Sequence, residues 1–234
     1  MKLLVCNHKM YLTNDEAIML SNDLKDINTS GIDLIVCPSY LNFDLFKSFT
    51  LGAQDAYYED RGAYTGKISA YDLSLRNIKY CIVGHSEERV NDSDEVINLK
   101  IKAMLRNSIT PILCVGDTKI DRELRRTSEV LKKQIIKGLK DVVLDTTQEI
   151  IIAYEPRFLI GGKNTLSKDE IEDILKYIKK ILMGINITRY KLLYGGGVTS
   201  SNIEKIKSNL YDGYLLGSAS CDALEIKNII KIIK

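Results

Sequence analysis

The sequence predicts an α/β fold, a single closed (β/α)8 barrel domain spanning residues 1–234. Eight short apolar runs recur along the chain, each followed by a segment with helical spacing, which is typical of a parallel sheet. The runs are continuous rather than alternating, as strands buried on both faces should be. No Pro- or Gly-rich linker divides the chain, which favours a closed barrel over the alternative, an open doubly wound sheet.

The predicted strands are the eight apolar runs themselves. In chain order they are residues 3–6, 34–37, 51–53, 80–83, 111–115, 150–154, 190–194 and 213–216.

Capping boxes indicate where several helices begin, because a Ser or Thr and a Glu three residues later satisfy each other's exposed N–H groups. The pairs that fit are Thr13 with Glu16, Ser167 with Glu170, and Ser201 with Glu204. Two segments also keep one face apolar at helical spacing, as helices packed on a sheet should. One face consists of Ile120, Leu124, Leu131, Ile135 and Leu139, and the other of Ile171, Ile174, Leu175, Ile178, Ile181 and Leu182.

Composition narrows the class of function. Thirty-three basic residues nearly cancel thirty-one acidic ones, so the net charge of +2 favours neither nucleic acid nor an anionic membrane as partner. The sequence contains neither a signal-peptide pattern nor an apolar stretch long enough to span a membrane, and we expect a cytoplasmic protein. The odd set of five cysteines has no CxxC pair, which predicts small buried thiols rather than zinc ligands or disulfides.

Polar residues and glycines gather directly after the predicted strands. The carboxyl ends of barrel strands meet at one rim, and that rim carries the active sites of such barrels. The residues are Asn7 and Lys9 after the first run, His85 after the fourth, Glu155 after the sixth, Gly195-Gly196-Gly197 after the seventh and Gly217-Ser218 after the eighth.

Three side chains of this set suit proton transfer. Glu155 ends an apolar strand, so it is partly desolvated and suits a general base, or it forms a strand-end salt bridge. His85 precedes a helical turn whose N–H groups disfavour an imidazolium, so a neutral ring could donate to a carbonyl oxygen, or it is merely structural. Lys9 either steadies an enediolate oxygen or is a solvated lysine. His8 is expected to point away from the rim site and has no assigned role.

The glycines permit another kind of contact. Gly195-Gly196-Gly197 and Gly217-Ser218 could bring backbone N–H groups close to a phosphate, although glycine-rich turns are also common. Gly161-Gly162 is either an ordinary turn or the flexible end of a lid. The connection at residues 54–67 is long for a fold with short loops, which suggests a role such as subunit contact.

These motifs, in this order, resemble the triosephosphate isomerase family from the first strand to the last. The motifs that carry the resemblance are Asn7-His8-Lys9-Met10, Gly84-His85-Ser86-Glu87 and Ala153-Tyr154-Glu155-Pro156. The supporting matches are Gly52-Ala53-Gln54-Asp55, Gly62-Ala63-Tyr64-Thr65-Gly66, Cys114-Val115-Gly116, Tyr194-Gly195-Gly196, Asp212-Gly213 and Gly217-Ser218-Ala219-Ser220.

The resemblance implies a TIM barrel that interconverts dihydroxyacetone phosphate and glyceraldehyde 3-phosphate through an enediolate, in glycolysis and gluconeogenesis, with no cofactor or metal. It assigns proton shuttling to Glu155, carbonyl polarisation to His85, and stabilisation of negative charge to Lys9 and Asn7. It further implies that Ser86 and Glu87 support these groups, with Ser86 holding Glu155 in an open position. Backbone N–H groups at Gly161, Gly197, Gly217 and Ser218 would grip the phosphate. A homodimer through the 54–67 loop, with Thr65 near its tip, is also implied.

The departures from the family lie around the lid and the phosphate. They are Arg157-Phe158-Leu159 in place of Val-Trp-Ala, a glycine segment Gly161-Gly162-Lys163 that appears one residue short, Gly197 in place of a serine, Ser218 in place of a glycine, and Lys67 in place of a glutamate. Because lid closure excludes water and protects the enediolate, these changes bear on rate, fidelity and substrate size. Two alternatives stay open: an isomerase of a four-carbon sugar phosphate of the erythrulose phosphate type, and a non-catalytic barrel.

Overall fold

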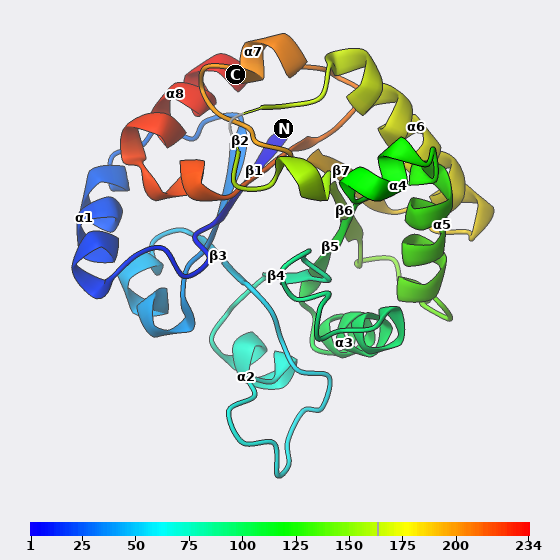
Figure 1. The fold of residues 1–234 in the computed structure, drawn as a ribbon. Coiled ribbons are helices and arrows are strands. Elements are labelled where there is room, and N and C mark those ends of the chain that lie inside the picture. Colours follow the sequence, from blue (N-terminus) through cyan, green and yellow to red (C-terminus); the bar gives the residue numbers. More distant parts are fainter. Residues whose placement is uncertain (163) are drawn as a thin grey trace.

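Eight parallel strands close into a barrel in the computed structural model, which describes residues 1–162 and 164–234 (Figure 1). Each strand pairs with its neighbours in the sequence, and β8 closes the ring by pairing with β1. The predicted (β/α)8 fold is therefore confirmed. The strands are β1 (Lys2–Asn7), β2 (Ile32–Cys37), β3 (Thr50–Ala53), β4 (Tyr80–Val83), β5 (Thr110–Val115), β6 (Ile150–Tyr154), β7 (Tyr190–Tyr194) and β8 (Gly213–Leu216).

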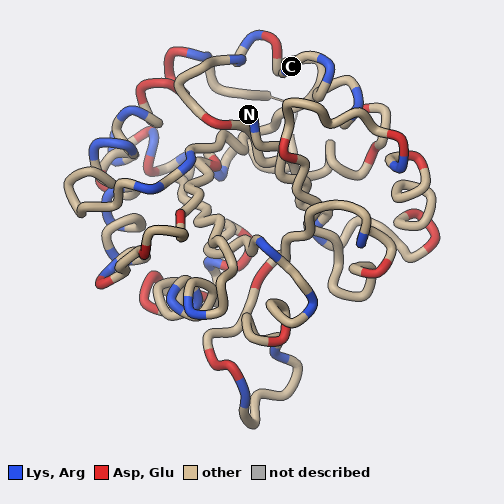
Figure 2. The backbone as a smooth tube through the Cα atoms, turned by 180° about the vertical axis from the view of Figure 1, so that it is seen from behind, with Lys and Arg blue, Asp and Glu red and all other residues tan. Residues whose placement is uncertain are grey.

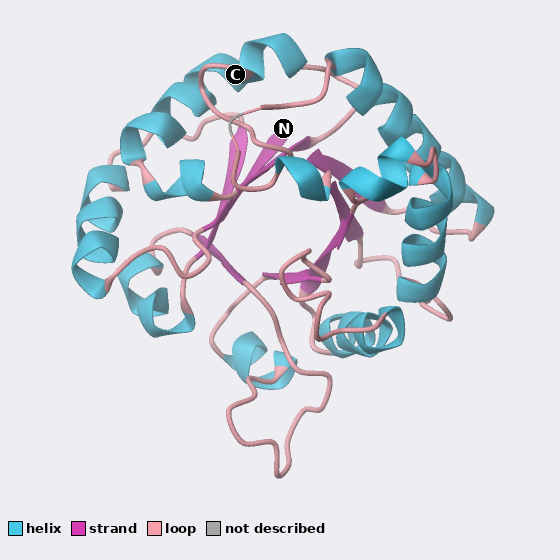
Figure 3. Ribbon diagram, in the orientation of Figure 1, coloured by secondary structure: helices cyan, strands magenta, loops and turns pink. Residues whose placement is uncertain are grey.

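Helices form an outer ring around the strands (Figure 3). They are α1 (Asn14–Leu24), α2 (Ala70–Leu75), α3 (Asp94–Arg106), α4 (Lys119–Glu123), α5 (Thr127–Gly138), α6 (Lys168–Gly184), α7 (Ile203–Ile206) and α8 (Ala223–Ile233). The 3-10 helices are η1 (Tyr40–Phe46), η2 (Arg157–Leu159) and η3 (Ser218–Cys221). The last two follow β6 and β8 directly, so they shape the rim at the carboxyl ends of the strands.

The strands are apolar over most of their length because both faces are buried. One core cluster lies between the strands and the helices, and a second fills the barrel itself. Leu3, Val5 and Ile35 belong to the inner cluster, whereas Leu4, Cys6 and Leu34 belong to the outer one. The inside of the barrel is thus packed with side chains, and a ligand site has to lie at an end of the barrel.

Two of the three predicted capping boxes are confirmed, and the third is wrong. The confirmed pairs are Thr13 with Glu16 and Ser167 with Glu170. Ser201 and Glu204 form no box, because α7 begins at Ile203 and takes Asn202 as its N-cap without a side-chain cap bond. The hydroxyl of Ser201 instead lies 2.8 Å from that of Thr199.

The predicted apolar face of α6 is confirmed, with Ile174 only partly buried. The face predicted from Ile120 to Leu139 is confirmed for Leu131, Ile135 and Leu139 and is wrong for Ile120 and Leu124. That segment forms two helices, α4 and α5, rather than one. Ile120 and Leu124 are 64% and 58% exposed, whereas Leu139 is buried. Arg125, between the two helices, has a left-handed φ of 56°, which interrupts the helix. The spacing of apolar residues alone does not reveal such an interruption.

The cysteines are free thiols. Cys6, Cys37, Cys81 and Cys114 are buried as predicted, and Cys221 is half-buried. No group of His, Cys, Asp and Glu side chains arranged to hold a metal ion occurs among residues 1–162 and 164–234.

Charged residues of both signs are distributed around the outer ring rather than gathered on one face (Figure 2). This distribution agrees with the small net charge of +2. Within the described part of the chain, no helix is both long and apolar enough to cross a membrane.

The connection between β3 and α2 projects from the body of the barrel (Figure 1). Residues 61–67 of this loop are all exposed. At its base the N–H of Tyr57 donates to the carbonyl of Ile68 at 2.7 Å. The ammonium of Lys100, on α3, binds Asp55 and Asp92 at 2.7 and 2.5 Å. The loop is therefore fixed at its base and exposed at its tip.

Candidate active site

A cavity of about 390 Å³ opens at the rim where the carboxyl ends of the strands meet. It gathers residues that are far apart in the sequence, from the ends of β1, β4, β6, β7 and β8. The predicted residues that line it are Asn7, Lys9, His85, Glu155, Gly161, Gly197, Gly217 and Ser218. The two remaining predicted residues, Ser86 and Glu87, lie beside it and line neighbouring cavities.

Lys9 is held in a strained backbone conformation at the mouth of the cavity. Its φ is 50°, a left-handed value that is uncommon for a residue other than glycine. Oδ1 of Asn7, the last residue of β1, accepts the N–H of Lys9 at 3.1 Å, and the amide of Gln54 donates to its carbonyl at 2.8 Å. Its ammonium lies 2.7 Å from Oε1 of Glu87. These contacts place the positive charge beside the cavity.

His85 and Glu155 face each other inside the cavity. Nε2 of the imidazole lies 3.4 Å from Oε1 of the carboxylate, and each residue is 5% exposed. The N–H of Glu87 donates to Nδ1 of His85 at 3.3 Å, so that nitrogen presents a lone pair and a neutral ring carries its proton on Nε2. A proton on Nε2 points at Glu155 and into the cavity.

Two opposing effects set the pKa of His85. Burial lowers the pKa, but the adjacent Glu155 carboxylate outweighs burial and the pKa is raised. The N–H groups of Glu88 and Arg89 both donate to the carbonyl of His85, so the helical turn expected there is present, although the next helix, α3, begins only at Asp94. The sequence-based expectation of a neutral ring took the turn into account and not the carboxylate.

Two glycines make room for Glu155. A Cβ on Gly116 would collide with the backbone carbonyl of Glu155, and a Cβ on Gly195 would lie 2.9 Å from its Cγ. The backbone N–H of Glu155 donates to Val115 at 2.9 Å, which extends the sheet by one residue. Sequence reasoning gave no such role to these glycines, although each directly follows a strand. Oε2 of Glu155 is buried without a hydrogen-bond partner among the described residues.

Four residues whose backbone amides could bind an anion line the same cavity. They are Gly161, Gly197, Gly217 and Ser218, the residues predicted to grip a phosphate. Within the described chain, no backbone hydrogen bond uses any of these four N–H groups outside the regular helices and strands. Unpaired amides that converge on a cavity form an anion-binding arrangement.

A carboxylate that sequence reasoning missed joins the glycine-rich loop after β7 to helix α8. Glu225, in the first turn of α8, accepts the N–H of Ser200 at 2.6 Å and its hydroxyl at 2.8 Å. Both residues also line the cavity. No motif marks the pair, because its members are 25 residues apart on different elements.

The segment after Glu155 folds as η2 and then runs along the cavity. The guanidinium of Arg122 lies 5.4 Å from the ring centroid of Phe158 and pairs with Glu170 at 2.6 Å. Ile160, Gly161 and Gly162 line the cavity, and Lys163, part of the predicted lid, lies outside the described residues.

His8 lies away from the cavity, as expected. Its ring is 2% exposed and packs edge-on against Phe46, with 5.1 Å between the ring centroids. Neither ring nitrogen has a hydrogen-bond partner among the described residues. Burial lowers the pKa of His8 to about 4.

Comparison with known proteins agrees with this geometry. The family model described as triosephosphate isomerase matches residues 2–233. Relatives named triosephosphate isomerase include proteins of Alkaliphilus oremlandii and Clostridium perfringens, each 34% identical over 96% of both chains. One from Endomicrobium trichonymphae is 36% identical over 99% of this chain and 98% of its own. The chain belongs to the triosephosphate isomerase family.

Proposed function

We propose that this protein is an enzyme, an aldose-ketose isomerase that interconverts dihydroxyacetone phosphate and D-glyceraldehyde 3-phosphate through an enediolate in glycolysis and gluconeogenesis. The observation that carries the proposal is the pair of His85 and Glu155, 3.4 Å apart and buried, in one cavity with Lys9 and four backbone amides. The reaction moves a proton between adjacent carbons, so it needs a base, a donor to the oxygens and a binding site for the phosphate. The proposal requires no cofactor or metal.

Glu155 is the proposed base. Its carboxylate is 5% exposed, and Oε2 has no hydrogen-bond partner among the described residues, so an oxygen is available to a substrate carbon. A poorly solvated carboxylate accepts a proton from carbon more readily than a hydrated one. Gly116 and Gly195 leave space for this side chain over the barrel mouth.

His85 is the proposed donor to the carbonyl oxygen. With Nδ1 accepting the N–H of Glu87, the Nε2 proton of the neutral ring is free to donate into the cavity. The charge of Glu155 raises the pKa of His85 only while that carboxylate is ionised. Once Glu155 has taken the substrate proton, the negative charge lies on the enediolate oxygens, where the Nε2–H of His85 and the ammonium of Lys9 stabilise it.

Lys9 and Asn7 are proposed to steady the developing negative charge. A fixed ammonium beside the enediolate oxygen lowers the free energy of forming this anion, because the ammonium does not have to reorient during the reaction. Asn7 holds the backbone of Lys9 in its strained conformation. Glu87 fixes the ammonium from the other side, and Ser86 is a proposed support for the base from the neighbouring small cavity.

The amides of Gly161, Gly197, Gly217 and Ser218 are proposed to bind the substrate phosphate. They lie in the same cavity as the acid–base pair, which suits a phosphate joined to the reacting carbons by a short chain. Each of the relatives named above is a triosephosphate isomerase, and no observation favours a four-carbon sugar or a non-catalytic barrel.

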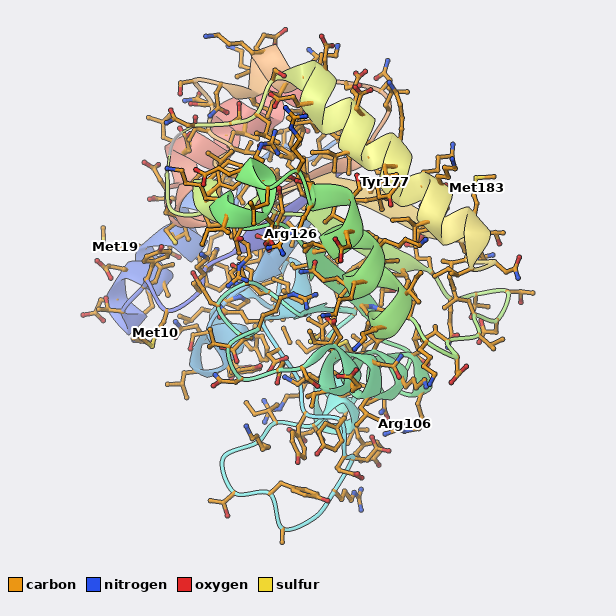
Figure 4. The ribbon with its side chains drawn as sticks, turned by 45° about the vertical axis from the view of Figure 1, so that its right-hand side comes forward. Met10, Met19, Arg106, Arg126, Tyr177 and Met183 are labelled. Carbon is orange, nitrogen blue, oxygen red and sulfur yellow. The ribbon has the colours of Figure 1, made fainter. Side chains whose placement is uncertain are left out.

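A homodimer through the 54–67 loop is proposed as the working form. The loop projects from the body with exposed residues 61–67, including Thr65. A cavity of about 490 Å³ beside Lys9 and Glu87 is large enough to receive such a tip from a second copy. Met10, labelled at the periphery in Figure 4, is 95% exposed, and Leu41 is 94% exposed, which fits surfaces that a partner covers. We also propose a cytoplasmic location, with no nucleic acid or membrane partner.

The function is tested by incubating purified protein with dihydroxyacetone phosphate in deuterated water, with a four-carbon ketose phosphate as comparison substrate. We expect deuterium at the carbon that exchanges its proton, and product formation at least about tenfold faster from the three-carbon substrate. Equal or faster turnover of the longer sugar would contradict the assignment of the substrate. Absence of exchange with both would contradict the proposed reaction.

A further inference from the structure

Three glycines follow β7, and each leaves space for a different part of the chain that begins at Glu155. A Cβ on Gly195 would lie 2.9 Å from Cγ of Glu155. A Cβ on Gly196 would lie 2.8 Å from Cγ of Pro156. The third glycine, Gly197, meets the far end of the segment. The loop after β7 therefore contacts Glu155, Pro156 and the described part of the lid, which consists of residues 157–162 and 164–166.

Gly197 makes the closest of these approaches to the lid. Its φ is 60°, and a Cβ there would collide with the carbonyl oxygen of Asn164 and lie 3.2 Å from the carbonyl oxygen of Gly162. Both atoms belong to the backbone, so they cannot rotate aside as the end of a flexible side chain could. Any side chain at position 197 requires the lid or the loop itself to move.

The lid segment is anchored at both ends around this contact. At its carboxyl end the N–H of Leu166 donates to the hydroxyl of Tyr194, the last residue of β7, at 3.1 Å. At its amino end Arg122 stacks over Phe158. Between these anchors, the carbonyls of Gly162 and Asn164 can lie where they do only because Gly197 has no side chain.

We infer that Gly197 is a positioning residue for the lid: its missing side chain lets backbone carbonyls of the lid rest directly on the loop after β7. The family resemblance places a serine at this position instead. A serine introduced there holds the lid away, because its Cβ occupies the place of the Asn164 carbonyl. Only the expected effect of Gly197 on catalysis rests on the proposed function.

Gly31 provides a matched control for the backbone strain. Its φ is 83°, so a side chain there carries a similar left-handed strain, but nothing lies within 4 Å of its Cβ position. It precedes β2 at the opposite end of the barrel. The variants Gly197→Ser and Gly197→Ala therefore share the strain of Gly31→Ala and add the collision with the lid.

Two measurements on these three variants and the parent protein test the inference. Amide hydrogen–deuterium exchange of the peptide covering residues 157–166, without ligand, reports the seating of the lid independently of activity. We expect exchange at least about fivefold faster in both Gly197 variants than in Gly31→Ala. Steady-state kinetics should show kcat/KM at least about tenfold lower in the Gly197 variants, with melting temperatures close to that of Gly31→Ala.

Lid exchange in Gly197→Ser equal to that in Gly31→Ala overturns the inference, whatever the activity. So does a Gly197→Ser protein whose kcat/KM equals or exceeds that of the parent, because the collision with the lid would then have no effect on catalysis. A parent protein without isomerase activity contradicts the proposed function and leaves the exchange comparison to decide the role of Gly197.

Discussion

The ammonium of Lys9 lies 2.7 Å from the carboxylate of Glu87, and the side chain of Lys9 is only 12% exposed. The same glutamate donates its backbone N–H to Nδ1 of His85. One residue thus fixes the cation through its side chain and the imidazole tautomer through its backbone. A substitution of the side chain alone keeps the backbone contact, but it also removes a carboxylate oxygen that lies 3.6 Å from Nδ1 of His85.

Glu87→Gln removes the charge that holds Lys9 and keeps the N–H that binds His85. Because the carboxylate is 54% exposed, we expect a change in folding free energy below about 1 kcal/mol. A misplaced ammonium stabilises the enediolate less, so kcat should fall about tenfold. The measurement is kcat and KM against Glu88→Gln, which changes the neighbouring carboxylate. Equal kinetics in the two variants would show that the pair does not position Lys9.

Glu155→Gln tests the proposed base. The amide has the shape of the carboxylate and cannot take a proton from carbon, so kcat/KM should fall by about 10²–10⁴. The melting temperature should change little, because Gln fits the space that Gly116 and Gly195 leave. Deuterium entry from solvent into dihydroxyacetone phosphate is the decisive readout. Undiminished exchange in the variant rules out Glu155 as the base.

Much of this site was predictable because each polar residue directly follows an apolar strand. The order of the strands places Asn7, His85 and Glu155 on one rim, whatever the details of packing. The sequence could not give the close approaches at Gly116 and Gly195, because these depend on where Glu155, which follows another strand, lies in space. The pair of Ser200 and Glu225 was also hidden, since it joins a loop to a helix without a motif.

The errors in the helices have a similar origin. The spacing of apolar residues from Ile120 to Leu139 suits one helix, but the left-handed backbone at Arg125 divides it. At Ser201, the hydroxyl interacts with Thr199 and not with a helix end. In both cases a local backbone conformation, which the residue pattern does not specify, decided the outcome.

The buried ring of His8 makes the fold sensitive to acid. Its pKa is about 4 in the folded protein and about 6.5 in the unfolded chain, so the unfolded state binds the proton first as pH falls. Stability is unaffected above about pH 6.5 and is lost progressively between about pH 6.5 and pH 4. The loss attributable to this ring should be about 2 kcal/mol at pH 5 and about 3 kcal/mol below pH 4.

His8→Phe isolates this effect, because phenylalanine is apolar and does not titrate. The free energy of unfolding in urea should fall between pH 7 and pH 5 by about 2 kcal/mol more in the parent than in the variant. The test compares how steeply the free energy of unfolding changes with pH in the two proteins, so a difference in their absolute stability does not affect it. Parallel pH profiles would show that His8 finds a partner for its proton in the folded state.

Lys100 couples the base of the 54–67 loop to α3, and its removal should weaken both the fold and the proposed dimer. Burial lowers the pKa of Lys100, but Asp55 and Asp92 outweigh it and raise the pKa, so the side chain stays charged. Lys100→Met leaves two partly buried carboxylates without their cation, which costs about 3–5 kcal/mol of folding free energy.

Adding Asp55→Asn to Lys100→Met removes one of the two stranded charges and should recover part of that loss. Urea unfolding measures the stability, and sedimentation velocity over a range of protein concentrations measures the dimer. Because Asp55 lies at the base of the loop, the single variant should dissociate at higher protein concentration than the double variant. Equal stability of the parent and Lys100→Met would mean that the ion pairs of Lys100 with Asp55 and Asp92 contribute no net stabilisation.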